Sequence, residues 1–228
     1  MKHPVSGYML VYNEVRSIEA SVRCLLHYCD DVLILDGGST DGSLEKLLML
    51  HREFEHLRIM LWKQQCHRYD MSWQETTRRK WATTACLHDW ILTIDADELL
   101  DDLPKDYFQL QESPLIFDMF HLVNKTEIIT RYNSNGNWQT WYPDSHVRYF
   151  NRTLARYANT RDHSYVESND GQSLMQQSQH SGTGLFHYHA LVNSDRKWDN
   201  SECRKLLETM PLPKPLPALD RLILVQSQ

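Results

Sequence analysis

Two aspartates separated by one residue are the feature of the sequence that points most directly to chemistry. Asp95 and Asp97 follow an apolar run, residues 90–94, that is typical of a buried strand. Side chains two positions apart on an extended chain lie on the same side of it. Carboxylates gathered in a dry cleft repel each other unless a cation compensates them, and oxygen ligands favour Mg²⁺ or Mn²⁺. An isolated pair of this kind is more often a solvated acidic turn, but the preceding strand favours a metal site.

A second pair of potential metal ligands, His187 and His189, occurs late in the chain. Both belong to a predicted strand at residues 184–191, where alternate side chains share one face. In a chain with twelve histidines such a pair is more often a surface or core feature. Together with Asp95 and Asp97, however, one of the two imidazoles becomes a candidate metal ligand, and we expect it to be His187.

A loop rich in glycine, residues 36–42, follows a second apolar run. Adjacent Gly37 and Gly38 allow a ligand to approach the backbone, and Asp36 could accept a hydrogen bond from a base or a ribose; the same composition also suits a plain tight turn. Neither of the glycine-rich phosphate-binding patterns is present. A basic run at residues 78–80 precedes Asp95 by one predicted element and could reach a diphosphate, although most such runs are solvated helix faces.

Strand and helix patterns alternate through the first hundred residues. The predicted strands are residues 7–12, 31–35, 57–62 and 90–94, and the helical patterns lie within residues 15–26, 44–51 and 72–86. This order predicts an α/β fold with a mostly parallel central sheet, right-handed crossovers and helices on both faces. Ligands bind such sheets at the carboxyl ends of the strands, which is where Asn13, Asp36, Asp95 and Asp97 fall.

The second half predicts a smaller, antiparallel portion. Strands are expected within residues 116–130, 147–150 and 184–191, followed by a helix at 194–209, a proline-rich segment at 211–217 and a final docking helix or strand at 219–225. We therefore expect one domain over residues 1–192, with halves at 1–100 and 101–192, and a tail at 193–228.

Composition narrows the class of protein. Of 228 residues, 41% are hydrophobic, which suits a packed core, and the formal net charge of −6 argues against a protein that coats nucleic acid or an anionic membrane. Five cysteines without a CxxC pair are typical of reduced thiols in a cytoplasmic protein. No run approaches the roughly 20 apolar residues of a membrane span. A cytoplasmic protein is expected, with peripheral association with the inner face of a membrane left open.

Three motifs, taken in order, resemble the family 2 glycosyltransferases of the GT-A fold: residues 11–14, 36–43 and 89–98. Later segments, at residues 141–144, 148–152 and 186–188, resemble the branch that contains bacterial lipopolysaccharide-core β-glycosyltransferases. The resemblance covers about residues 5–192. The chain departs from the family pattern before Tyr12, where a proline is usual, at Gly37, where many relatives carry a second aspartate, and at Lys80, where an asparagine commonly follows the arginine.

The resemblance implies a nucleotide-sugar donor, for which a UDP-sugar is expected, and a Mn²⁺ or Mg²⁺ cofactor. The residues themselves do not distinguish UDP, GDP and dTDP. The implied donor-binding residues are Tyr12, Asn13, Glu14, Asp36, Gly38, Arg79, Asp95, Ala96, Asp97 and Arg148. Within this set Asp97 would bind the metal, Asp95 would contact ribose or metal, and His187 would complete the metal site.

The resemblance also implies an inverting transfer to an acceptor hydroxyl. Asp144 would be the general base, and Glu167 is the competing candidate. The acceptor could be a glycan, a lipid-linked sugar or another hydroxyl compound, and no strong nucleic-acid binding is expected. Two rival functions remain open. One is a metal-dependent phosphodiesterase or nuclease that uses Asp95, Asp97, His187 and His189, which leaves the loop at Asp36 unexplained. The other is a non-catalytic module that binds a nucleotide-sugar.

Overall fold

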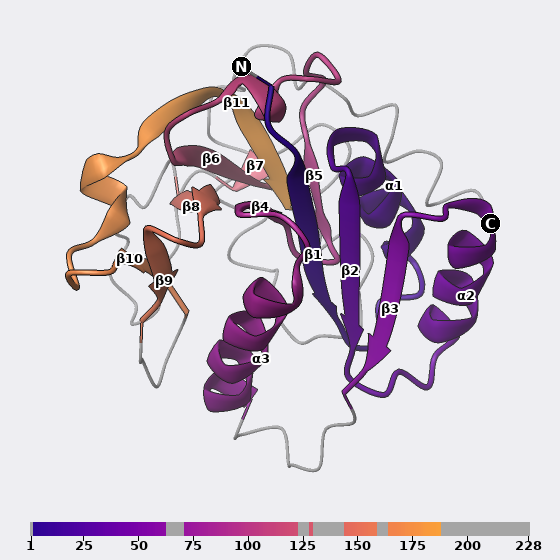
Figure 1. Ribbon diagram of the computed structural model, residues 1–228. Helices are drawn as coiled ribbons and strands as arrows, with labels where there is room; N and C mark the ends of the chain where they lie inside the picture. Colours follow the sequence, from indigo (N-terminus) through magenta and orange to yellow (C-terminus); the bar gives the residue numbers. More distant parts are fainter. Residues whose placement is uncertain (1, 63–70, 123–127, 130–143, 159–163, 188–228) are drawn as a thin grey trace.

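The computed structural model describes residues 2–62, 71–122, 128–129, 144–158 and 164–187 (Figure 1). Its first part follows the predicted alternation of strands and helices. The elements are β1 (Val5–Val11), α1 (Ile18–Tyr28), β2 (Asp31–Asp36), α2 (Ser43–Glu53), β3 (Leu57–Leu61), α3 (Met71–Ala85) and β4 (Trp90–Thr93). The four strands are mutually parallel in the order β3-β2-β1-β4, as expected for right-handed crossover units.

The second part extends the same sheet rather than forming a separate one. Its strands are β5 (Glu98–Leu100), β6 (Leu115–Leu122), β7 (Ile128–Ile129), β8 (Asp144–Asn151) and β11 (Gln179–His187). The sheet continues β4-β8-β6-β11-β5, with β7 beside β6. β8 is antiparallel to both its neighbours, β11 is parallel to β6, and β5 is antiparallel to β11. The predicted α/β class with a smaller antiparallel portion is confirmed.

A two-stranded sheet stands apart from the main one. It consists of β9 (Ala155–Tyr157) and β10 (Val166–Ser168), and it is followed by the short 3₁₀ helix η2 (Leu174–Gln177). A second short 3₁₀ helix, η1 (Phe108–Leu110), precedes β6. The expected helix at 194–209, the proline-rich segment and the final element at 219–225 lie outside the described residues.

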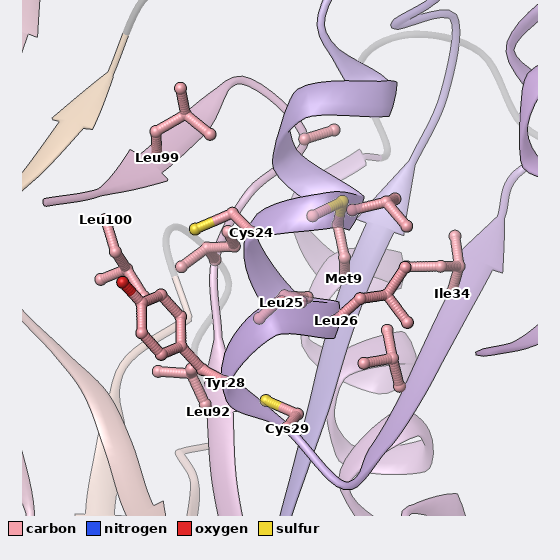
Figure 2. Packing of buried hydrophobic residues seen from close by; sticks show 14 of the residues in the cluster. Met9, Cys24, Leu25, Leu26, Tyr28, Cys29, Ile34, Leu92, Leu99 and Leu100 are labelled. Atoms are coloured by element: carbon pink, nitrogen blue, oxygen red, sulfur yellow. The ribbon is translucent and has the colours of Figure 1, made fainter. Parts of the chain in front are cut away.

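Alternation along the strands divides the core between the two faces of the sheet. On β1, Val5, Met9 and Val11 pack with α1 and α2, whereas Tyr8 packs with α3. Figure 2 shows the first of these clusters, where α1 lies against the sheet and also covers β5. The labelled members are Met9, Cys24, Leu25, Leu26, Tyr28, Cys29, Ile34, Leu92, Leu99 and Leu100.

Close approach of α1 to β1 explains the glycine in the middle of that strand. A Cβ at Gly7 would lie 2.9 Å from Cys29 Sγ and 3.2 Å from Leu25 Cδ2, closer than packed atoms tolerate. The helix is therefore seated firmly on the strand whose end leads into the candidate site. Among the described helices, none combines the length and the apolar character needed to cross a membrane.

Candidate active site

The loops after β1 and β2 are joined to each other by hydrogen bonds. Asn13 has a left-handed backbone (φ 58°), a conformation that asparagine tolerates better than most residues. Its N–H donates to Ser39 Oγ at 2.9 Å, and its Oδ1 accepts the N–H of Thr40 at 2.8 Å. The two loops therefore form one platform at the carboxyl ends of adjacent parallel strands.

Two further bonds extend this platform toward α1 and α2. The N–H of Glu14 donates to Ser43 Oγ at 2.8 Å, and the N–H of Val15 donates to Asp41 Oδ2 at 2.9 Å. Glu14 is buried, whereas Tyr12 is 39% exposed. Of the predicted donor-binding residues in this loop, Tyr12 thus offers its ring to solvent or a ligand.

Asp36 shapes the glycine-rich loop from within. It is fully buried; its Oδ1 accepts the N–H groups of Gly38 and Ser39, each at 2.8 Å, and its Oδ2 accepts Ser39 Oγ at 2.7 Å. Gly38 has φ 91°, which favours glycine. The Asp36 carboxylate therefore holds the loop in the shape that a ligand would meet.

The turn that carries Asp95 and Asp97 is anchored on both sides. The carbonyl of Ala96 accepts Ser21 Oγ of α1 at 2.8 Å, and the N–H of Asp95 donates to Glu98 Oε2 at 2.8 Å. Ala96 itself belongs to the core beneath α1. These contacts fix the direction of both aspartate side chains.

Two arginines share the Asp95 carboxylate. Arg79 Nη2 donates to Oδ1 at 2.7 Å and Arg148 Nη2 donates to Oδ2 at 3.1 Å, so α3 and β8 meet at this residue. Burial alone would raise the pKa of Asp95, but Arg148 and Arg79 outweigh it and hold the pKa far below its usual range. Asp95 is therefore ionised at every physiological pH.

Glu98 is a buried member of the same cluster that sequence reasoning missed. Its sequence neighbours are acidic and suggest a solvated turn, but Glu98 is only 1% exposed and begins β5. Arg148 Nη2 donates to its Oε1, and burial raises its pKa in spite of that guanidinium. The signal that could have found it is the apolar pair Leu99-Leu100, which predicts a short buried strand rather than an exposed helix start.

Asp97 lies beside His187. The distance from Asp97 Oδ2 to His187 Nε2 is 3.1 Å, and the antiparallel pairing of β11 with β5, in which His187 is opposite Glu98, brings the two together. Burial would lower the pKa of His187, but the Asp97 carboxylate raises it to about 9. Of the three residues named from the sequence as metal ligands, Asp97 and His187 are thus adjacent, whereas both oxygens of Asp95 accept hydrogen bonds from arginines. His189 lies outside the described residues.

The Asp97–His187 pair suits a divalent ion in its chemistry and spacing. Two neighbouring ligands at about 2.1 Å from an octahedral ion are about 3 Å apart, and the observed separation is 3.1 Å. Within the described part of the chain, no group of three or more potential ligands is gathered. These two residues would therefore supply part of a coordination shell, with further ligands from substrate oxygens or water.

A cleft of about 220 Å³ lies next to Asp95. Asp95 and the two arginines that hold it line the cleft on one side, and β10 with the segment before it lines another. The described lining residues are Glu75, Arg79, Asp95, Ser145, His146, Val147, Arg148, Tyr157, Ser164, Tyr165, Val166, Ser173 and Met175.

The two candidate bases have different positions. Asp144 is the first residue of β8, where it pairs with Met119 and directly precedes the cleft-lining Ser145; its side chain lies outside the described part of the structure. Glu167 pairs with Arg156 across β9 and β10, with Oε1 at 3.0 Å from Nε, and alternates with Val166, which lines the cleft. The structure therefore does not bring Glu167 to the other site residues.

A sequence-family comparison gives the identity of the domain. The model of the family described as glycosyl transferase family 2 matches residues 6–168, more than half of the chain. The chain belongs to this family. The match spans the two loops, the Asp95–Asp97 turn and β8, so the family resemblance drawn from the motifs is confirmed.

Among curated relatives, an uncharacterized glycosyltransferase of Rickettsia bellii is 23% identical over 158 residues, which is 68% of this chain and 49% of that protein. An uncharacterized glycosyltransferase of Rickettsia typhi is 22% identical over 157 residues. The chain thus spans about half the length of the curated relatives it matches.

A solved structure described as a mannosyltransferase from Pyrobaculum calidifontis in complex with GDP-Man and Mn²⁺ has 12% identity to this family 2 chain and a TM-score of 0.48. The superposition covers all of this chain and 71% of that one.

Proposed function

We propose that the chain is an inverting, metal-dependent glycosyltransferase that moves a sugar from a nucleotide-sugar, with a UDP-sugar as the first donor to test, to a hydroxyl of a glycan, a lipid-linked sugar or a similar acceptor. The observation that carries the proposal is the convergence, at the carboxyl ends of β1, β2 and β4, of the joined loops, the arginine-held Asp95 and the Asp97–His187 pair. Family membership supports the reaction class.

The joined loops suit a nucleoside. The exposed ring of Tyr12 can stack on a base, and the loop backbone that Asp36 orders, with glycine at position 38, allows close approach of base or ribose. Because hydrogen bonds already fix the loops, little conformational entropy is lost when a ligand binds. Donor affinity would therefore come from a preformed surface.

The ion is assigned to Asp97 and His187, with Mn²⁺ or Mg²⁺ as cofactor. Each oxygen of Asp95 already accepts a hydrogen bond from an arginine, so Asp95 is assigned to the ribose side and to positioning Arg79 and Arg148. A divalent ion would stabilise the negative charge that develops on the diphosphate leaving group. Arg79 would neighbour the donor phosphates or sugar while its Nε and Nη2 stay on Glu75 and Asp95, so it would act by holding Asp95 in place.

Asp144 is proposed as the general base. It would take the proton of the acceptor hydroxyl while that oxygen forms its bond to the sugar anomeric carbon and the bond to the diphosphate oxygen breaks, with the electron pair leaving on the nucleoside diphosphate. A single displacement of this kind inverts the anomeric configuration. Glu167 is less suited to the role because its carboxylate is engaged by Arg156.

The test is donor binding followed by turnover. UDP-, GDP- and dTDP-sugars are screened by thermal shift with and without Mn²⁺, since a ligand at 100 times its Kd stabilises the folded state by about 2.7 kcal/mol. We expect one donor to raise the melting temperature in a Mn²⁺-dependent manner. Asp97→Ala should lose that shift and the release of nucleoside diphosphate, while its unliganded melting temperature stays close to that of the wild type.

Asp89→Ala is the matched control, because Asp89 is also an aspartate near β4 but is paired with Arg152 away from the turn. The control should keep both donor binding and turnover. Full turnover by Asp97→Ala, or in excess chelator, would contradict the metal role. Cleavage of a phosphodiester without a sugar donor would favour the rival hydrolase, and donor binding without release of nucleoside diphosphate would favour the non-catalytic module.

A further inference from the structure

The cleft beside Asp95 has a wall that the donor site does not need. Donor loops follow β2 and β1, Asp95 follows β4, and β8 comes next in the sheet order. The cleft lies on the β8 side of Asp95 and is completed by β10 with its flanking residues and by η2. Its second wall therefore comes from the second half of the chain, where Val166 and Leu174 pack in one cluster with Tyr8 of β1.

Tyr165 is the aromatic side chain that this wall presents. It is 50% exposed and lines the cleft together with Met175 of η2, which is 45% exposed. A half-exposed aromatic ring beside a thioether is a surface on which the apolar face of a sugar ring can lie.

The backbone that carries Tyr165 is held in place on both sides. Ser164 Oγ and Thr76 Oγ1 of α3 form a hydrogen bond at 2.6 Å, and the carbonyl of Tyr165 accepts the N–H of Ala158 at 2.9 Å. The next residue, Val166, pairs with Tyr157, whose hydroxyl accepts a hydrogen bond from Tyr8 in β1. The exposed ring therefore stands on a rigid support, which lowers the entropic cost of stacking a ligand on it.

The polar groups of the cleft suit an uncharged ligand. Its described lining holds two carboxylates, Glu75 and Asp95, and two guanidinium groups, Arg79 and Arg148, so their formal charges cancel. These charges are also paired with one another: Arg79 bonds both carboxylates, and Arg148 bonds Asp95. An anionic ligand would have to compete with carboxylates that the arginines already hold.

Hydroxyl groups, in contrast, find matching partners. Glu75 Oε1 accepts from Arg79, and within the described residues its second oxygen has no protein donor; the side chain is 36% exposed. Ser173 also lines the cleft. A carboxylate oxygen and a serine hydroxyl beside an aromatic ring are the combination that binds sugar hydroxyls and the sugar face together.

We propose that this cleft is the acceptor subsite, that it takes an uncharged hexopyranose, and that Tyr165 is its stacking residue. This inference rests on the proposed glycosyl transfer, because only then does a second sugar have to lie next to Asp95. It narrows the acceptor class to a neutral sugar residue, in preference to a uronic acid, a sugar phosphate or a phosphorylated polyol.

The experiment uses methyl hexopyranosides as probes. Saturation-transfer NMR is recorded on the full chain with Mg²⁺ and UDP, for the methyl glycosides of glucose, galactose and mannose, and for two charged counterparts, methyl glucuronide and glucose 6-phosphate. We expect at least one neutral glycoside to bind, with saturation concentrated on its ring C–H protons, and both charged probes to bind at least fivefold more weakly.

Variants separate stacking from folding. Tyr165→Ala and Tyr165→Leu should each weaken the neutral glycoside roughly five- to tenfold, whereas Tyr165→Phe, which keeps the ring, should bind as the wild type does. Leu154→Ala is the matched control, since Leu154 is also a large exposed apolar residue, 65% exposed, and lies in the turn before β9 outside the cleft lining. Melting temperatures and UDP binding of all four variants should equal those of the wild type.

Equal binding by Tyr165→Ala, tighter binding of a charged probe, or absence of binding by every neutral glycoside would each overturn the inference. The outcome is distinguishable from failure of the proposed function, which is read from nucleotide-sugar binding and its dependence on Asp97. If the chain binds a nucleotide-sugar but no neutral glycoside, only the acceptor-subsite inference is wrong. If the chain binds glycosides in a Tyr165-dependent manner but no nucleotide-sugar, only the proposed glycosyltransferase function is wrong.

Discussion

The two halves of the central sheet are built in different ways. β3, β2, β1 and β4 are parallel and are joined by local helical crossovers, whereas β8, β6, β11 and β5 mix parallel and antiparallel pairing between segments far apart in the sequence. The first half presents two loops that are joined by hydrogen bonds across adjacent parallel strands, between residues 26 to 29 positions apart. The second half supplies charged side chains that reach the Asp95 turn from 53 and 90 positions away. The comparison teaches that the proposed donor platform depends on neighbouring crossover units, whereas the cluster around Asp95 and Asp97 depends on pairing between segments much farther apart in the sequence.

The largest effect should come from the second half and appear in activity alone. Asp144→Asn removes the proposed base and should lower turnover by about 10²–10⁴-fold. Because Asp144 is the first residue of β8 and asparagine has nearly the same shape, stability should change by less than about 0.5 kcal/mol. The measurement is nucleoside diphosphate release with an identified donor and acceptor, alongside urea unfolding.

Glu167→Gln is the control for the base, since it removes the competing carboxylate and its exposed ion pair with Arg156. Turnover should stay within about twofold of the wild type. If Glu167→Gln loses activity and Asp144→Asn does not, the assignment of the two carboxylates must be exchanged.

The junction between the halves should be the most sensitive point for stability. Arg148→Met leaves buried Glu98 without its guanidinium partner and removes one of the two donors to Asp95, which should destabilise the fold by about 3–5 kcal/mol in urea unfolding. The double variant Arg148→Met with Glu98→Gln should recover part of that loss, because the uncompensated charge is gone.

Arg156→Met is the matched control for Arg148. It breaks an ion pair whose arginine side chain is 58% exposed, and such pairs contribute little, so the cost should stay below about 1 kcal/mol. Equal losses of unfolding free energy for the two variants would show that burial does not make the Arg148 ion pairs more important than that of Arg156. The junction would then be no more sensitive than the two-stranded sheet of β9 and β10.

In the first half, the buried carboxylate of Asp31 should make the stability of the fold depend on pH. Burial alone would raise the pKa of Asp31, but hydrogen bonds from Arg58, Leu87 and Ser6 outweigh it and hold the pKa below its usual value. A depressed folded-state pKa contributes stability above the unfolded value near 3.9 that is lost as the pH falls toward the folded value. Asp31→Asn should therefore cost about 2 kcal/mol at pH 7 and progressively less below about pH 5.

A constant difference between wild type and Asp31→Asn from pH 7 to pH 3 would contradict this assignment. Unfolding in urea at several pH values measures it directly. Asp106→Asn serves as the control, because Asp106 forms only an exposed pair with Lys2 and should leave the acid limb of the stability curve almost unchanged.

The smallest expected effect concerns the platform itself. Asn13→Ala removes the acceptor for the Thr40 N–H, and alanine tolerates the left-handed φ of 58° less well than asparagine does. The free energy of unfolding should therefore fall by about 1 kcal/mol. Asn13→Gly loses the same acceptor but tolerates the backbone, and should lose less. Both should raise the donor KM with little change in kcat; a change in kcat alone would place Asn13 in the reaction rather than in the platform.

Local patterns were sufficient to predict the first half. Residues 31–35 and 90–94 are continuous apolar runs between helical patterns, and the observed β2 and β4 agree with them to within a residue. Period-two spacing also made Asp97 and His187 candidates for one site, and the structure places them 3.1 Å apart. The spacing did not distinguish His187 from His189; that His187 completes the site is what the family resemblance implies.

The second half resisted prediction because its pairings are non-local. No short-range signal indicates that β11 lies between β6 and β5, or that the arginines at 79 and 148, one from a helix and one from a strand, share one carboxylate. The burial of Glu98 could not be predicted for the same reason: β5 is paired with β11, a strand more than 80 positions away in the sequence.

Pairing of β5 with β11 also sets the order in which the protein matures on the ribosome. Asp97 and His187 are 90 positions apart, so a nascent chain displays the aspartate long before its imidazole has been translated. The proposed ion-binding pair cannot form until β11, the last strand of the sheet within the described residues, has been translated. We therefore expect the chain to bind the cation only late in translation. A stalled chain that ends before residue 187 should not bind a divalent metal ion at this site.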